Sequence, residues 1–280
     1  MPVMTRSPID ARLRAAVRLV WASMPGDPAI AMPGAREHVL PTGALHIALR
    51  ISGPPLRLFD GAHDVLGRTV AHALVGGARS RFHVRDIAEP VASVGALLQP
   101  GAARALLGAS EGDLAGRHTP LDAFWGCEAD YALAQLQEAR TPAARLDAFE
   151  GWLLRRLGQQ SIVLAPGIAK ALAALRAHPL PIGELAQACG YSHRHFIALF
   201  RESTGLAPKA YARVQRLDRL LGLASDPAQR WAELALRAGF GDQAHLAHEF
   251  KAMTGMSPQA WRGAQPASPR HVPVPAVGIQ

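Results

Sequence analysis

The sequence predicts an α+β fold: a β-rich N-terminal domain with flanking helices, then an all-α C-terminal domain of two helix-turn-helix units joined by a long helix. Two different sequence patterns predict this fold. Residues 36–100 are short apolar runs broken by Gly and Pro, which is typical of strands and turns, whereas residues 162–263 show helical periodicity between turn residues. With 280 residues, 49% of them hydrophobic, the chain can form two cores.

The N-terminal domain, residues 1–160, is expected to fold as a small barrel or sandwich. Residues 8–24 have helical spacing of apolar residues and predict one amphipathic helix, and five to seven short strands should follow. His46 and Ala48 alternate with Ile47 and Leu49, which indicates a sheet with two different faces. Helices are expected again at residues 100–108, 130–139 and 142–157.

Composition excludes several classes of protein. No apolar run approaches the roughly 20 residues of a membrane span, so we expect a soluble, cytoplasmic protein with no membrane partner. Cys127 and Cys189 lie 62 positions apart without further ligands at metal spacing, which argues against a disulfide scaffold and a cysteine zinc site. Residues 264–280 are rich in Pro and poor in large apolar side chains, and they predict a disordered tail.

Positive charge is concentrated in the C-terminal part of the chain. Residues 162–280 have 13 Lys and Arg against 7 Asp and Glu, whereas residues 1–161 have 17 against 15. Because a concentrated field attracts an oppositely charged partner, this asymmetry favours an anionic partner for the C-terminal domain.

A duplicated segment is the strongest signal in the sequence. Residues 184–211 align with residues 233–261 when Gly241 is treated as an insertion, and ten of the 28 pairs are identical. In each copy a short helix should end at a Gly that allows positive φ, and a small polar side chain should cap the next helix. These turn and cap residues are Gly190 and Ser192 in the first copy, and Gly239 and Asp242 in the second.

The second helix of each copy should bury one face and expose the other. Phe196 and Phe200 in the first copy, and Leu246 and Phe250 in the second, mark the buried faces. The first exposed face comprises His193, Arg194, Ile197, Ala198 and Arg201. The second comprises Gln243, Ala244, Ala247, His248 and Lys251.

These exposed faces suit the major groove of double-stranded DNA. Arg194 can pair with guanine, Gln243 with adenine, and Ile197 can contact a thymine methyl group. The alanines allow close approach, while Arg201 and Lys251 are placed for phosphates. Residues 208–223 predict a long helix between the copies, with Arg213, Arg216 and Arg219 exposed, so that both recognition helices should enter successive major grooves of one bipartite site, about 34 Å apart.

On these residues the last hundred positions resemble the DNA-binding domain of AraC/XylS-type transcriptional regulators. The resemblance covers about 35% of the chain. The family's closing signature is matched by the following residues: Gly239, Phe240, Asp242, Leu246, Phe250, Lys251, Gly255, Ser257 and Pro258. The family often has Arg where this chain has His248, which supplies less fixed charge. The resemblance implies a transcriptional activator whose residues 1–160 form a cupin-like sensor or oligomerisation domain. It allows RNA polymerase, a small-molecule effector of unknown identity and a second copy of the chain as partners.

Two other functions stay open at this point. One alternative is a metal-dependent cupin-like enzyme fused to a DNA-binding domain, because residues 1–160 contain six histidines that could bind a metal. They are His38, His46, His63, His72, His83 and His118. The paired His-x-His of such enzymes is absent, as are the motifs of serine hydrolases and phosphate loops, so we expect no catalytic residue, no metal and no cofactor. The other alternative is a protein that coats DNA without regard to sequence.

Overall fold

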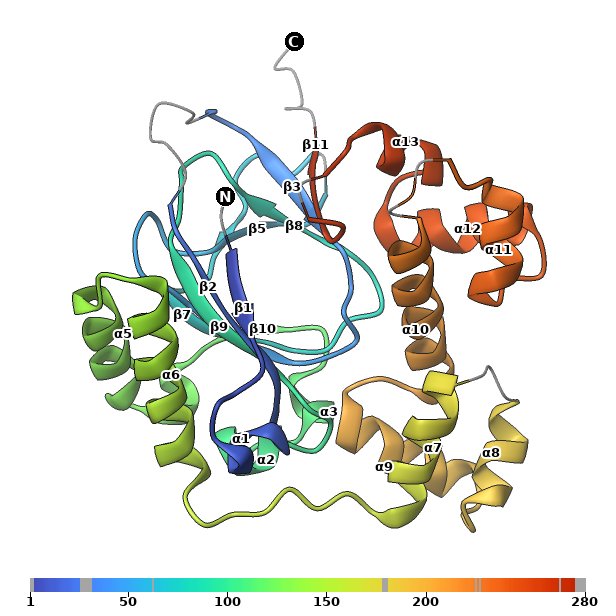
Figure 1. Ribbon diagram of the computed structural model, residues 1–280, viewed down its shortest axis with the longest axis horizontal. Helices are drawn as coiled ribbons and strands as arrows, with labels where there is room; N and C mark the ends of the chain where they lie inside the picture. Colours follow the sequence, from blue (N-terminus) through green and yellow to red (C-terminus); the bar gives the residue numbers. More distant parts are fainter. Residues whose placement is uncertain are drawn as a thin grey trace.

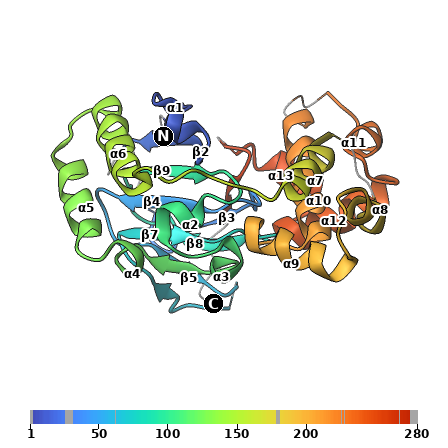
Figure 2. The same cartoon turned by 90° about the horizontal axis from the view of Figure 1, so that it is seen from below.

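The computed structural model describes residues 3–25, 32–61, 63–177, 181–224, 226, 228–266 and 268–274. It confirms the expected α+β fold, with a β-rich part (residues 3–160) beside a helical part (residues 162–263), as Figures 1 and 2 show. Residues 158–165, which contain no helix or strand, connect the two parts. Among the described residues, no helix combines the length and apolar character required to cross a bilayer.

The β-rich part is built on two antiparallel sheets that face each other. In the larger sheet the strand order is β1 (Val3–Arg6), β2 (Val17–Ser23), β9 (Ser93–Leu98), β4 (His46–Arg50), β7 (Ala73–Gly76) and β10 (His118–Pro120). In the smaller sheet the order is β11 (His271–Val274), β3 (Arg36–Val39), β8 (His83–Asp86), β5 (Arg57–Phe59) and β6 (Arg68–Thr69).

The two faces of the larger sheet differ as the alternation in β4 predicts. Ile47 and Leu49 are fully buried against the helices on the outer face, whereas Ala48 packs with Leu58 of the smaller sheet. The helices of this part are α1 (Ala11–Arg14), α2 (Ala103–Leu107), α3 (Glu111–Leu114), α4 (Asp122–Trp125), α5 (Glu128–Glu138) and α6 (Pro142–Leu157). Helix α6 packs across β2 and β9, with α5 beside it (Figure 1).

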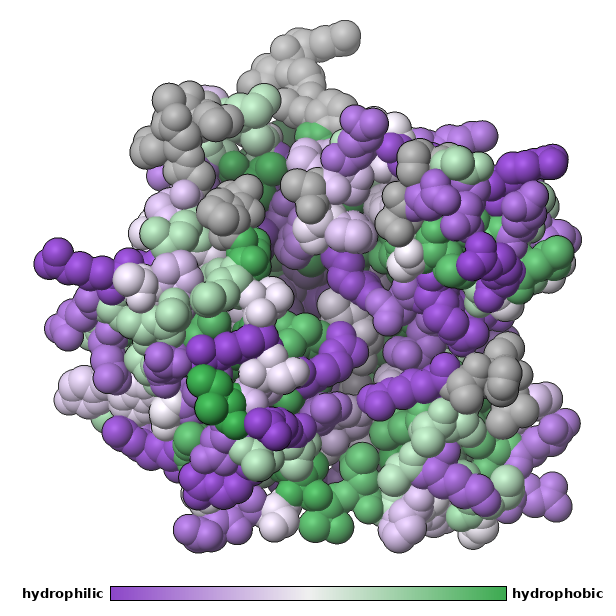
Figure 3. All heavy atoms as spheres, viewed as in Figure 1, coloured by the Kyte–Doolittle hydropathy of each residue, from purple (hydrophilic) through white to green (hydrophobic). Residues whose placement is uncertain are grey.

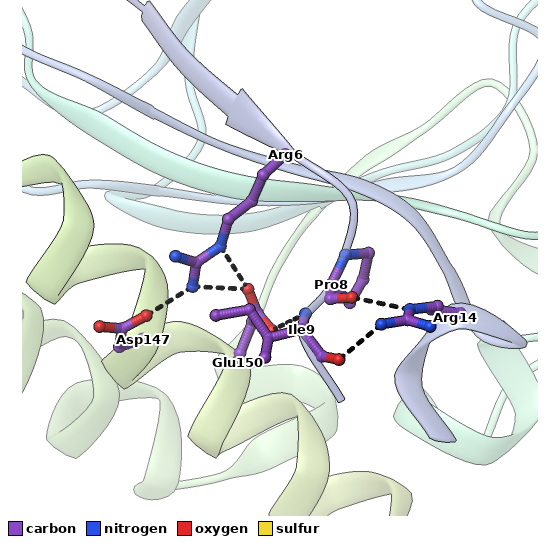
Figure 4. A network of polar contacts seen from close by, with 6 residues as sticks. All are labelled: Arg6, Pro8, Ile9, Arg14, Asp147 and Glu150. Atoms are coloured by element: carbon purple, nitrogen blue, oxygen red, sulfur yellow. Dashed lines mark hydrogen bonds and ion pairs between the residues drawn. The ribbon is translucent and has the colours of Figure 1, made fainter. Parts of the chain in front are cut away.

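The expected helix over residues 8–24 is wrong. Only α1 is helical, and Val17–Ser23 is a strand paired with β1 on one side and β9 on the other. Figure 4 shows how the turn between β1 and α1 is fastened: the Arg6 guanidinium pairs with Glu150 and Asp147 of α6, and the Ile9 amide donates to Glu150 over 2.8 Å. The β-branched valines of this segment favour a strand once both neighbours supply backbone partners.

The helical part contains the duplicated unit between two further helices. Its elements are α7 (Pro166–Ala177), α8 (Ile182–Ala188), α9 (His193–Thr204), α10 (Pro208–Leu223), α11 (Trp231–Ala238), α12 (Gln243–Thr254) and α13 (Pro258–Gly263). One apolar core runs through all of them and also includes Leu40, Ala78 and Val272. The two parts of the chain therefore share a packed contact.

The expected disordered tail is wrong for residues 271–274, which form strand β11 on the edge of the smaller sheet. Val272 is buried in the core of the helical part, and His271 lies 3.0 Å from the Glu37 carboxylate, which also pairs with Arg85. Burial raises the pKa of Glu37, but these two partners more than offset it and lower the pKa to about 2. Residues 275–280 lie outside the described residues.

Candidate DNA-binding surface

The first recognition helix, α9, begins and ends where the sequence predicts. The Ser192 hydroxyl accepts from the His195 amide at the N-cap, and Gly205 ends the helix at φ 76°. Gly190, in the preceding turn, has φ 76° as well. Phe196 and Phe200 are fully buried, so the opposite face of α9 has to point away from the core.

The second recognition helix, α12, repeats this geometry. Gly239 ends α11 at φ 89°, the Asp242 carboxylate accepts from the His245 amide over 2.7 Å, and Gly255 ends α12 at φ 79°. Leu246 and Phe250 are buried. The Gly, cap and apolar positions of the two copies thus produce two helices of equal length.

The structure brings the ten expected DNA-contacting residues onto the outer faces of these two helices. Ile197 is half-buried, and the other nine are exposed: His193, Arg194, Ala198, Arg201, Gln243, Ala244, Ala247, His248 and Lys251. Within the described part of the chain, no hydrogen bond or ion pair occupies the side chains of Arg194, Arg201 or Lys251. Figure 3 shows hydrophilic residues gathered over α11 and α12 on the face in view. These cationic side chains are therefore available to an anionic partner.

Two arginines of α10 have a different role from the expected one. Arg213, Arg216 and Arg219 were expected to be exposed, but all three are half-buried. Arg213 and Arg216 pair with Glu249 of α12, over 2.6 and 3.7 Å. Arg216 also lies over the Phe240 ring, 5.4 Å from its centroid. Since Glu249 lies on the inner side of α12, these contacts fix the second recognition helix against α10.

The equivalent histidines His195 and His245 pack against the turns that precede the recognition helices. Each meets the aromatic ring just before the cap edge-on: His195 lies 5.4 Å from Tyr191, and His245 lies 5.6 Å from Phe240. The His245 Nδ1 also accepts from the amide of the inserted Gly241 over 3.2 Å. The sequence already shows that this histidine is identical in the two copies. The identity follows from the turn, where the ring has to pack against an aromatic side chain.

Three histidines of the β-rich part gather between the two sheets. The His118 ring lies 4.7 Å from that of His83 and 5.9 Å from that of His46. Burial, assisted by the charge of Arg79, lowers the pKa of His46 to about 4 and of His83 to about 2, and it lowers the pKa of His118 as well. These rings are neutral at pH 7. Within the described ranges, no three His, Cys, Asp or Glu side chains are arranged to hold a metal ion.

Comparisons with known proteins match the helical part. Residues 185–264 match the model of a family described as "Helix-turn-helix domain". The chain is 35% identical over 85 residues to the putative HTH-type transcriptional regulator YkgA of Escherichia coli, covering 30% of this chain and 36% of the relative. It is 32% identical over 83 residues to the HTH-type transcriptional regulator Rv1931c of Mycobacterium tuberculosis, covering 30% of this chain and 32% of that protein.

The chain thus spans about a third of the length of the curated relatives that it matches. Among solved structures, ToxT from Vibrio cholerae is similar over 93% of this chain and 98% of its own, with 13% identity and a TM-score of 0.46.

Proposed function

Because residues 185–264 form an AraC-type helix-turn-helix domain, we propose that this chain is a transcriptional regulator that binds double-stranded DNA by sequence. The observation that supports it best is the duplicated geometry. Helices α9 and α12 both begin at a side-chain cap and carry exposed cationic and small side chains on one face, and α12 adds the Gln243 amide. A helix of this kind fits the major groove with its N-terminal residues at the base edges.

The residues divide by chemistry into base readers and phosphate contacts. Arg194 is proposed to pair with guanine through two hydrogen bonds, and Gln243 with adenine in the same way. Ile197 would contact a thymine methyl group with its exposed side. Arg201 and Lys251 lie in the last turns of α9 and α12, where they would meet phosphates and fix the register.

The two recognition helices are proposed to read one bipartite site. Helix α10 buries Tyr211, Val214 and Leu217 in the shared core and holds α12 through the Glu249 ion pairs. A fixed separation between two reading helices suits successive major grooves, about 34 Å or one helical turn apart. A single chain would then read an asymmetric site.

The β-rich part is proposed to control this DNA binding, through a small-molecule effector or through dimerisation. From the resemblance to AraC/XylS-type regulators we propose that the regulator activates transcription by contact with RNA polymerase. We assign residues 1–160 to the controlling domain and residues 162–263 to the DNA-binding domain.

The proposal is tested by selection from random DNA duplexes with the full chain. Repeated binding and amplification should enrich two short sequence blocks about one helical turn apart. The double variant Arg194→Ala, Gln243→Ala provides the control, and it should enrich neither block while still binding DNA weakly at low salt. Recovery of unselected sequences with the unaltered chain would contradict sequence-specific reading and would favour a protein that coats DNA.

A further inference from the structure

The C-terminal end of the second recognition helix is held by the β-rich part. Three successive carbonyl oxygens at the end of α12, which an isolated helix leaves without partners, each accept a hydrogen bond from that part. Arg81 Nε donates to Ala252 over 3.2 Å, the Phe82 amide donates to Met253 over 2.8 Å, and the His38 ring donates through Nδ1 to Thr254 over 2.9 Å.

Ring packing reinforces these hydrogen bonds. The His38 and Phe82 rings are stacked, with centroids 4.2 Å apart, directly against Gly255. A Cβ atom at Gly255 would lie only 2.5 Å from the Phe82 ring and 2.8 Å from the His38 ring. The glycine therefore serves two purposes: it permits the positive φ that ends α12, and it admits two rings where a side chain would collide.

The first recognition helix is docked at the equivalent turn. Gly205 lies so close to the β-rich part that a Cβ atom there would be 2.9 Å from Ala78 Cβ and from the Glu111 carbonyl oxygen. The Gly101 amide donates to the Ser203 carbonyl over 2.9 Å. Both recognition helices are thus anchored on one body at their C-terminal ends, while their DNA-facing residues remain exposed.

From this pair of anchors we propose that His38 and Phe82 are positioning residues for DNA recognition, which hold the second recognition helix at the spacing that a bipartite site requires. The inference rests on the proposed function. When α9 and α12 are held one major groove apart before binding, α12 meets its DNA block at a high effective concentration once α9 is bound. When the anchor is lost, the unit of α11 to α13 keeps its contacts with α10 and the hydrogen bond from Trp261 to Pro269 beside β11, but the end of α12 is no longer fixed, and that advantage falls.

The test compares full-length variants on three duplexes: the selected bipartite site, the first block alone and the second block alone. His38→Ala should weaken binding to the bipartite duplex about tenfold and leave binding to either single block at low salt unchanged. Hydroxyl-radical protection of the bipartite duplex should weaken over the second block only. Phe82→Ala should act in the same direction.

Two further variants separate positioning from general damage. His38→Asn retains a nitrogen that can donate to the Thr254 carbonyl and should recover much of the lost affinity. His63→Ala removes an exposed histidine of the same part and should change nothing. The inference is overturned if His38→Ala binds the bipartite duplex like the unaltered chain, or if it loses single-block binding to the same extent. Failure of the unaltered chain to prefer the bipartite duplex would instead overturn the proposed function.

Discussion

Glu111, beside the contact between the two parts of the chain, offers a quantitative test of how burial shifts a carboxyl pKa. This carboxylate on α3 is only 4% exposed, and it accepts a hydrogen bond from the Ala103 amide over 3.0 Å, while its backbone carbonyl faces Gly205. Burial raises the pKa of Glu111 from 4.5 to about 7, even though the Ala103 amide favours the charged form. The group is therefore easier to bury protonated than ionised.

The sign of the pH dependence follows from this direction. Because the pKa is higher in the folded state, ionisation of Glu111 destabilises the fold progressively as pH rises from about 4.5 to about 7. At 1.36 kcal/mol for each unit, this shift contributes about 3 kcal/mol in full, of which about 2 kcal/mol or slightly more should appear between pH 5 and pH 8. Glu111→Gln removes the ionisation and should gain that amount relative to the unaltered chain.

The assay is urea unfolding followed by tryptophan fluorescence at pH 5 and at pH 8. The quantity of interest is the difference in unfolding free energy between Glu111→Gln and the unaltered chain, since other titrating groups cancel in it. Glu202→Gln, which alters an exposed carboxylate paired with Arg104, is the control variant and is measured alongside at both pH values. A pH-independent difference for Glu111→Gln would refute the burial argument.

The remaining predictions concern DNA contacts and the C-terminal strand. Arg194→Ala should relax base preference at one position and cost about 1 to 3 kcal/mol in binding, measured by titration against the selected site and its single-base variants; a uniform loss on all sequences would contradict a base contact. Lys251→Ala should weaken binding to every sequence alike and reduce the salt dependence by about one phosphate contact, which titrations at several salt concentrations would measure. The pKa of Glu37 is lowered to about 2, so ionised Glu37 should stabilise the fold above pH 4.5 and lose that contribution as pH falls toward 2. Acid unfolding of Glu37→Gln should therefore depend less steeply on pH than that of the unaltered chain. An unaltered profile would show that the pairing of Glu37 with His271 contributes nothing to stability.

The helical part could be predicted closely from the sequence because its signals are local. A Gly that requires positive φ, a cap such as Ser192 or Asp242, and apolar residues at helical spacing act within one turn of each other. Duplication doubled each signal. The ten residues chosen for DNA contact stay predictions, but the structure does place them on the outer faces of α9 and α12.

The errors arise where distant partners decide the structure. Val17–Ser23 has helical spacing, yet β1 and β9 provide backbone partners on both of its edges. Val272 lies in a Pro-rich segment that is ordered by distant partners: it pairs with β3, buries the Val272 side chain and places His271 against Glu37. Arg213 and Arg216 pair with Glu249, more than thirty positions further along the chain. No local pattern records such contacts.

Recognition of separate DNA blocks by α9 and by α12 is tested most directly by one comparison. Duplex selection should be repeated with Arg194→Ala and with Gln243→Ala in the full chain. Each variant should lose base preference in a different block, and the two blocks should lie about one helical turn apart. Loss of preference at the same base pairs in both variants, or one continuous block, would contradict recognition of separate blocks.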